Sequence, residues 1–85
     1  MRHVDLIELT VTCDLAIAGR SLVEVGPPGS GRVMAVVRRD RVLVPTGQTL
    51  LLDGDGLLLP CGRQRRRDVV AEVTAWARGE PADER

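Results

Sequence analysis

The sequence predicts a small α+β domain in which two helices pack against a short, largely antiparallel sheet. Three observations lead to this class. The 85 residues suffice for one domain, short apolar stretches alternate with turn-forming residues, and one stretch near the end has helical spacing. The predicted order over 1–78 is β-α-β-β-(β)-β-α, and the residues of 79–85 read as a polar C-terminal tail.

The first predicted element is a strand at 4–12, where apolar residues occur on both sides of an alternating pattern. Val4 and Leu6 lie on one side, and Ile7 and Leu9 lie on the other. This arrangement suits a strand with one face in the core and the other near a partner.

A helix and a hairpin follow in the middle of the chain. The helix is predicted at 19–25, where Gly19 and Ser21 are start signals. Two apolar runs, 33–37 and 42–44, flank the charged pair Arg39-Asp40 and predict a hairpin. Met34, within the first run, is expected in the core.

The last third combines a turn, a strand and the second helix. Pro45 ends the hairpin, because proline cannot donate to a ladder. After a short apolar segment, the sequence Asp-Gly-Asp-Gly at 53–56 predicts a turn, and 57–60 a strand. A helix is predicted at 64–78, ended by Gly79. Its apolar stripe consists of Val69, Val70, Val73, Trp76 and Ala77.

The composition excludes several classes of function. Twelve arginines balance twelve acidic residues, which argues against a nucleic-acid-binding protein. The chain has no apolar run long enough to enter a membrane, and we expect it in the cytoplasm with its thiols reduced. Cys13, Cys61 and His3 lack metal-site spacing. There is no pair of nucleophile and base, so we expect neither an enzyme nor a catalytic residue.

The short chain and its single aromatic residue predict a homodimer. Trp76 is the one aromatic side chain, so the core must be built from small aliphatic residues. Such a core leaves little stability to spare in a chain of this length, and burial against a second copy would add to it.

The glycine-rich stretch GPPGSGRV at 26–33 resembles a phosphate-binding loop but lacks its chemistry. Arg32 stands where the loop needs lysine, and Val33 stands where it needs a hydroxyl. A strand-like run follows in place of a helix. We therefore interpret the stretch as a mobile connection without Walker-type nucleotide binding.

Several motifs in order resemble the TrkA C-terminal domain, also called the RCK C-terminal domain. They are GRSLVEV at 19–25, the apolar strand ending in Arg38, the strand ending in Pro45, the Thr-Leu segment at 49–51, and Gly54-Asp55 before a last apolar strand. Gly54-Asp55 is also explained as turn chemistry, and Ser21 as a helix cap with Leu22 in the core and Glu24 in solvent. The segment 26–32 departs from the family by replacing a longer polar segment.

The resemblance implies a regulatory domain that controls potassium or sodium/proton transport through a channel or antiporter subunit. Some members bind cyclic di-AMP at the dimer cleft, and the matching positions here are Arg32, Val33 and Pro45. No other cofactor is implied. A purely structural dimerisation or docking domain is the alternative. The chain is either an excised domain or a stand-alone subunit.

The basic run RQRRR at 63–67 reads as a first helical turn that faces water. Arginines at this end oppose the helix dipole, so something should compensate for them. Asp68, Glu72, acids of a partner, or an anionic ligand are the candidates.

Overall fold

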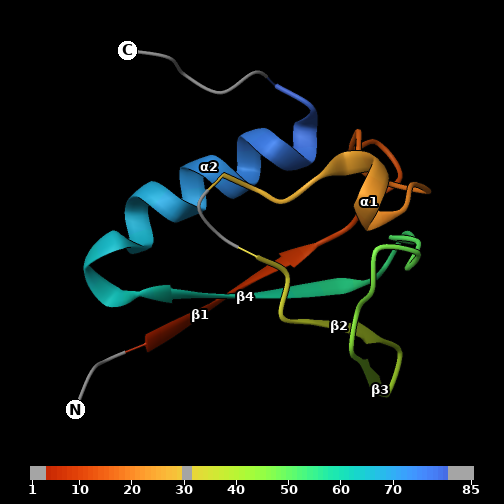
Figure 1. Cartoon of the computed structure of the whole chain (residues 1–85), viewed down its shortest axis with the longest axis horizontal. Helices are drawn as coiled ribbons and strands as arrows, with labels where there is room; N and C mark the ends of the chain where they lie inside the picture. Colours follow the sequence, from red (N-terminus) through yellow and green to blue (C-terminus); the bar gives the residue numbers. More distant parts are fainter. Residues whose placement is uncertain (1–3, 30–31, 81–85) are drawn as a thin grey trace.

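The computed structural model describes residues 4–29 and 32–80. Four antiparallel strands form one sheet in the order β1-β4-β2-β3, and the long helix α2 packs on one face of it (Figure 1). This confirms the predicted α+β class. The elements are β1 Val4–Thr10, α1 Leu22–Val25, β2 Ala35–Arg38, β3 Arg41–Leu43, β4 Gly56–Gly62, a 3-10 turn Arg63–Arg65, and α2 Arg66–Arg78.

Strand β4 is the centre of the sheet and of the core. It pairs with β1 along seven positions, from Val4 opposite Gly62 to Thr10 opposite Gly56, and with β2 on its other side. Its side chains Leu57 and Leu59 are fully buried. They pack with Ile7 of β1 and with the α2 residues Val69, Val73 and Ala77, and Trp76 packs partly buried against this cluster. Val70, which the predicted stripe also included, is 38% exposed and does not belong to the core.

The first strand and the first helix are shorter than predicted. Strand β1 ends at Thr10 because the ladder breaks at the next position: the Val11 N–H still donates to the carbonyl of Asp55 opposite it, but the Val11 carbonyl accepts from Gly54 instead of Asp55. Helix α1 begins at Leu22 because Gly19 and Arg20 exchange backbone hydrogen bonds with Leu51. Both boundaries are set by contacts with the loop before β4, which local sequence patterns do not reveal.

The predicted hairpin forms, with its strands displaced. Strand β2 starts at Ala35, two residues later than expected, and β3 ends at Leu43. In the two-residue turn Arg39 has φ of 56°, while Asp40 keeps a negative φ, the φ pattern of a type II′ turn. The expectation that Met34 lies in the core is wrong, because its side chain is 45% exposed just before β2.

The last part of the chain follows the prediction closely. Strand β4 extends beyond the predicted 57–60 at both ends. The predicted helix at 64–78 is divided into a 3-10 turn and α2, and Gly79 ends α2 in the left-handed conformation. Only an isolated bridge, Ser21 with Leu50, represents the optional strand at 49–51. Residues 81–85 of the predicted tail lie outside the described residues.

Candidate functional site

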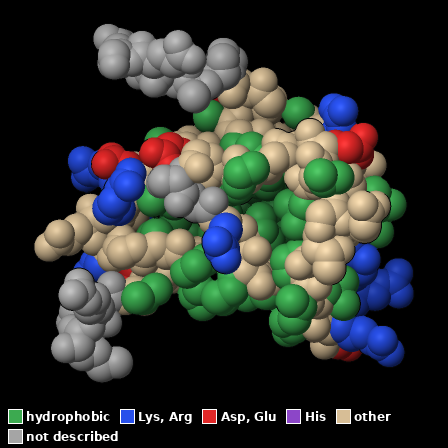
Figure 2. Space-filling model, viewed as in Figure 1, with side chains coloured by type: hydrophobic (Ala, Val, Ile, Leu, Met, Phe, Trp, Pro, Cys, Tyr) green, Lys and Arg blue, Asp and Glu red, His purple; other side chains and the backbone are tan. Residues whose placement is uncertain are grey.

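The three predicted ligand-binding residues line one open pocket of about 320 Å³. Arg32 and Val33 approach it from the segment before β2, and Pro45 approaches it from the segment after β3. Apolar side chains surround a hollow on this face of the molecule (Figure 2). The lining residues are Leu22, Val23, Gly26, Pro27, Pro28, Arg32, Val33, Pro45, Thr46 and Gly47.

Helix α1 forms one wall of the pocket and is fixed at its start by a capping box. The Ser21 N–H donates to Oε1 of Glu24 at 2.9 Å, and the Glu24 N–H donates to Oγ of Ser21 at 3.4 Å. The hydrogen bond from the Ser21 backbone lowers the pKa of the exposed Glu24 carboxyl. The predicted cap is therefore confirmed, and Glu24 takes part in it while remaining in solvent. Leu22 is only half-buried, not fully in the core as expected.

Backbone hydrogen bonds join α1 to the opposite wall of the pocket. The Leu22 N–H donates to the Thr49 carbonyl at 3.1 Å, and the Val23 N–H donates to the Gly47 carbonyl at 2.9 Å. These bonds hold the segment 45–49 beside α1. Because the segment follows directly from the β2–β3 hairpin, they also fix the position of Pro45.

The segment 26–29 is not the mobile connection that its glycines and prolines predict. The indole Nε1 of Trp76 donates to the Val25 and Gly26 carbonyls at 3.2 and 3.0 Å, and Pro28 is fully buried. Gly29 has φ of 47°, and a Cβ on it would lie 2.6 Å from Oε1 of Glu72. The segment is thus packed across α2. A strand follows it in place of a helix, which agrees with the rejection of a phosphate loop.

The pocket combines an apolar wall with one exposed cation. Pro27, Val33 and Pro45 offer nonpolar surface, and Arg32 carries the guanidinium. No acidic side chain is among the lining residues that the structure describes. This chemistry suits a ligand with a flat nonpolar ring and an anionic group.

An ion pair that the sequence analysis missed holds the hairpin against the rest of the domain. Arg38 donates from Nε and Nη2 to the two carboxylate oxygens of Asp55, at 3.0 and 2.8 Å, and from Nη2 to the Leu50 carbonyl. The Asp55 side chain is 2% exposed and also accepts from the Leu52 N–H. The hydrogen bonds from Arg38 lower the pKa of this carboxyl despite its burial.

Turn chemistry therefore describes only part of the role of Asp55. Its bond with the Leu52 backbone is the local contact expected of a turn aspartate, and Gly54 has the expected positive φ, 92°. The bond with Arg38 joins residues 17 positions apart. Arg38 and Asp55 both belong to the motifs that resemble the TrkA C-terminal domain. This resemblance was the only feature of the sequence analysis that linked the two residues.

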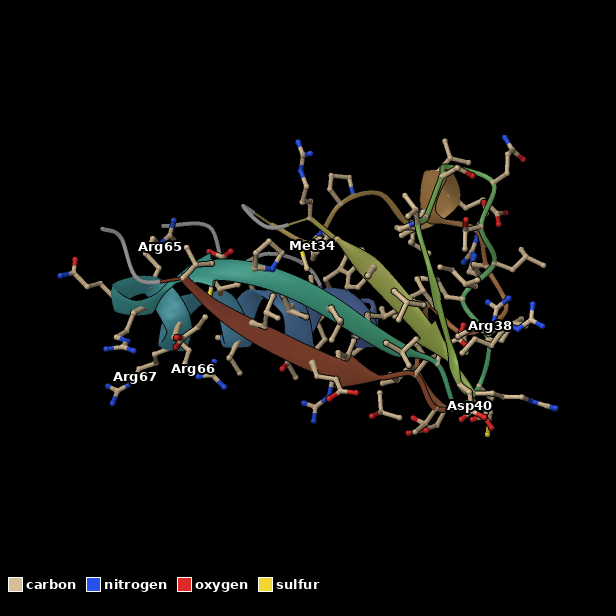
Figure 3. The ribbon with its side chains drawn as sticks, turned by 90° about the horizontal axis from the view of Figure 1, so that it is seen from below. Met34, Arg38, Asp40, Arg65, Arg66 and Arg67 are labelled. Atoms are coloured by element: carbon tan, nitrogen blue, oxygen red, sulfur yellow. The ribbon has the colours of Figure 1, made fainter. Side chains whose placement is uncertain are left out.

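The arginines of the RQRRR run are exposed, as predicted, and lie apart from the pocket. Arg65 pairs with Glu72 at 3.5 Å, which confirms one predicted source of compensation. Asp5 of β1 was not foreseen: its carboxylate lies 3.8 Å from Arg63 and 3.5 Å from Arg66. In Figure 3 the labelled Arg65, Arg66 and Arg67 project at the opposite end of the molecule from Arg38.

The two cysteines take no part in the pocket. Cys13 is exposed, Cys61 is buried, and both are free thiols. Within 4–29 and 32–80, no three His, Cys, Asp or Glu side chains gather to hold a metal ion. Over the same residues, no helix has the length and apolar character needed to cross a membrane. His3 lies outside the described residues.

Comparisons with known proteins agree with the fold and the motifs. The TrkA-C domain model matches residues 6–73. A solved structure described as "Structure of RCK domain with cda" is similar, with a TM-score of 0.61 and 21% sequence identity. The similarity covers 79% of this chain and 94% of that one. No curated protein matches. The family model spans most of the chain, including the first predicted helix and the second up to residue 73, and the chain therefore belongs to the TrkA-C domain family.

Proposed function

We propose that this chain is a ligand-sensing domain that controls potassium or sodium/proton flux, and that it binds a cyclic dinucleotide such as cyclic di-AMP between two copies. TrkA-C and RCK domains are regulatory rather than catalytic and are generally linked to the control of ion transport. One observation carries the proposal of a ligand: Arg32 and Val33, on the segment before β2, and Pro45, on the segment after β3, line one pocket. The similar RCK domain was solved "with cda".

The chemistry of the pocket fits half of such a ligand. The Arg32 guanidinium can form charge-assisted bonds to a phosphate, while Val33 and Pro45 can pack against an adenine ring. At about 320 Å³ the pocket is small and open. A two-fold symmetric dinucleotide would therefore place one base and one phosphate in each of two facing copies.

The test is calorimetry with cyclic di-AMP in the presence of EDTA. We expect one ligand for two chains, because each copy supplies one half of the site. Arg32→Ala should weaken binding by about 1.5–3 kcal/mol per contact, or roughly 10–150-fold. Arg67→Ala is the matched control, since Arg67 is an exposed arginine outside the pocket and should leave affinity unchanged.

Two results would reject the cyclic dinucleotide. One is the absence of heat, and the other is one-to-one binding that requires magnesium. If no nucleotide binds, the alternative is a structural dimerisation or docking domain without a small ligand. In either role, we propose that the domain acts in the cytoplasm, without enzymatic activity, on a channel or antiporter subunit.

A further inference from the structure

Three arginines of the RQRRR run form a strip along one flank of α2, at the spacing of a single helical face. They are Arg63, Arg66 and Arg67, and we call them the arginine strip. The carboxylate of Asp5 in β1 is shared between two of them, at 3.8 Å from Nε of Arg63 and 3.5 Å from Nη1 of Arg66. Both distances exceed the roughly 2.7–2.9 Å of a strong charge-assisted hydrogen bond. Arg67 has no ion-pair partner among the described residues.

The remaining acids near the start of α2 lie on its other flank. Arg65, Asp68 and Glu72 follow one another at spacings of three and four, and Arg65 pairs with Glu72 at 3.5 Å. Val70, which is 38% exposed, lies one turn after Arg66 on the flank of the arginine strip. This flank therefore carries positive charge that the described residues do not fully neutralise, and it ends in an apolar side chain.

The arginine strip lies beside the free edge of β1. The Val11 N–H, just beyond this strand, donates to the Asp55 carbonyl opposite it, and bonded pairs recur at every second residue of an antiparallel ladder. The alternate residues therefore point their N–H and C=O groups away from the sheet. Within 4–29 and 32–80, the one partner of these groups is Arg66, whose Nη1 donates to the Leu6 carbonyl over 3.4 Å. The outward residues are Val4, Leu6, Glu8 and Thr10.

The edge of β1 has none of the features that discourage a further strand. It has seven residues without proline or a basic side chain, and its pairing with β4 has no bulge. On the face of the sheet away from α2, Val4 is 65% exposed and Leu6 is 51% exposed. In Figure 3 β1 forms one border of the sheet, and Arg66 and Arg67 project from the start of α2 beside that border.

This combination favours a protein segment over a lipid surface. Lipid headgroups would attract the arginine strip, and hydrocarbon would accept Val4 and Leu6, but hydrocarbon offers no partners to the outward N–H and C=O groups. A strand that adds to the edge supplies those partners along its whole length. The positive charge of the strip requires that such a strand be acidic.

We propose that β1 and the arginine strip bind an extended acidic segment of a partner protein, which pairs with β1 as a further strand. Side chains of this segment that point toward α2 meet Arg63 and Arg66 and are acidic. Those that point to the other face meet Val4 and Leu6 and are apolar. Arg66 exchanges its long bond with the Leu6 carbonyl for a carboxylate of the partner, which frees that carbonyl for the new ladder.

The partner site is separate from the pocket. The strand order β1-β4-β2-β3 places β1 and β3 at opposite edges of the sheet. The pocket is lined by α1 and by the segments that flank the β2–β3 hairpin, and no residue of β1 or of the arginine strip is among its lining residues. Failure of cyclic di-AMP to bind would therefore leave this proposal intact.

The test is an NMR titration of the isotope-labelled chain with three synthetic peptides, each with seven residues to match β1. The first alternates glutamate and valine, beginning and ending with glutamate. The second has lysine in place of each glutamate, and the third has proline in place of the central valine. We expect the first to bind and to shift the outward amides of Leu6 and Glu8. The other two should bind at least about fivefold more weakly.

Each alternative result contradicts a part of the proposal. Absence of binding by the first peptide overturns it. Equal binding of the proline peptide would mean attraction between charges without strand pairing, and equal binding of the lysine peptide would mean strand pairing without a need for acids. Shifts confined to the pocket residues would place the peptide elsewhere, and they would overturn it as well.

Two charge reversals test the arginine strip with the first peptide. Arg66→Glu should weaken its binding roughly two- to tenfold, because an attractive pair is replaced by repulsion. A glutamate at the start of a helix favours the helix, so unfolding does not explain such a loss. Arg39→Glu is the matched control, since Arg39 is an exposed arginine in the hairpin turn and should leave the affinity unchanged. Wild-type affinity of Arg66→Glu, or equal losses in the two variants, overturns the proposal.

Discussion

The two halves of this domain are held together by different kinds of interaction. In the half made of β1, β4 and α2, the side chains of Leu57, Leu59 and Val73 are at most 1% exposed and pack on one another. In the half made of α1, the hairpin and the loop before β4, Val36 and Leu51 join the same core, and side-chain hydrogen bonds are added to it: the capping box, the Trp76 indole and the pair of Arg38 with Asp55. Apolar burial is insensitive to direction, whereas hydrogen bonds depend on geometry. The candidate pocket lies in the second half, beside the capping box of α1.

The largest effect should come from opening a cavity in the first half. Leu59→Ala removes a fully buried side chain between the sheet and α2 and should lower the free energy of unfolding by about 2–5 kcal/mol. Leu52→Ala, at a position 39% exposed, should cost much less. Chemical denaturation of both variants measures the difference. Equal losses would mean that the core is not centred on β4.

Breaking the ion pair tests the second half. Asp55→Asn keeps the size of the side chain but removes the charge that two Arg38 bonds require, and we expect a loss of about 1.5–3 kcal/mol. Arg38 is about one-third exposed, and solvent screening there limits the loss of stability. Asp53→Asn, the exposed neighbour in the same turn, is the control. If both variants unfold at the wild-type denaturant concentration, the pair contributes nothing to stability.

The same pair predicts how stability depends on pH. The folded state holds the pKa of Asp55 below its unfolded value, so its contribution is complete above about pH 4 and is lost as pH falls through the lower, folded value. Denaturation of the wild type from pH 6 downward should show this loss. The slope should be smaller in Asp55→Asn, and an unchanged slope would assign the acid sensitivity to other carboxyls.

A smaller effect is expected from the backbone of the turn. Gly54 has φ of 92° and open space around its Cα, so Gly54→Val should cost about 1–2 kcal/mol through backbone strain alone. Gly62→Val, where the space is also open and φ is −68°, is the matched control. Asp53→Ala should likewise be mild. Denaturation midpoints that agree among the three variants would contradict the strain at Gly54.

Sequence patterns predicted the first half of the domain better than the second. The spacing of Val69, Val73 and Ala77 identified the buried face of α2, because burial follows the helical period. The Arg38–Asp55 pair was missed, because each residue has an adequate local explanation as the end of a strand or part of a turn. Local rules also failed at 26–29, where Pro28 packs and Trp76 donates to the backbone across about 50 positions of sequence.

The pocket residues were found by a different route. Neither periodicity nor composition connects Arg32 and Val33 with Pro45, and the family resemblance supplied that connection. The structure places them around one pocket because the hydrogen bonds of α1 with Thr49 and Gly47 bring the segment after β3 next to the segment before β2.

The pairing of β1 with β4 has a consequence for how the chain is made. Strand β1 ends at Thr10, and its ladder partner β4 starts only at Gly56. At about 5–20 residues per second, a ribosome needs a few seconds to synthesise the intervening chain. During that interval the edge of β1 that will pair with β4 and the apolar side chain of Ile7 lack their intrachain partners. Ribosomes that follow one another on the same message therefore hold copies of this strand close together before either copy has completed its sheet.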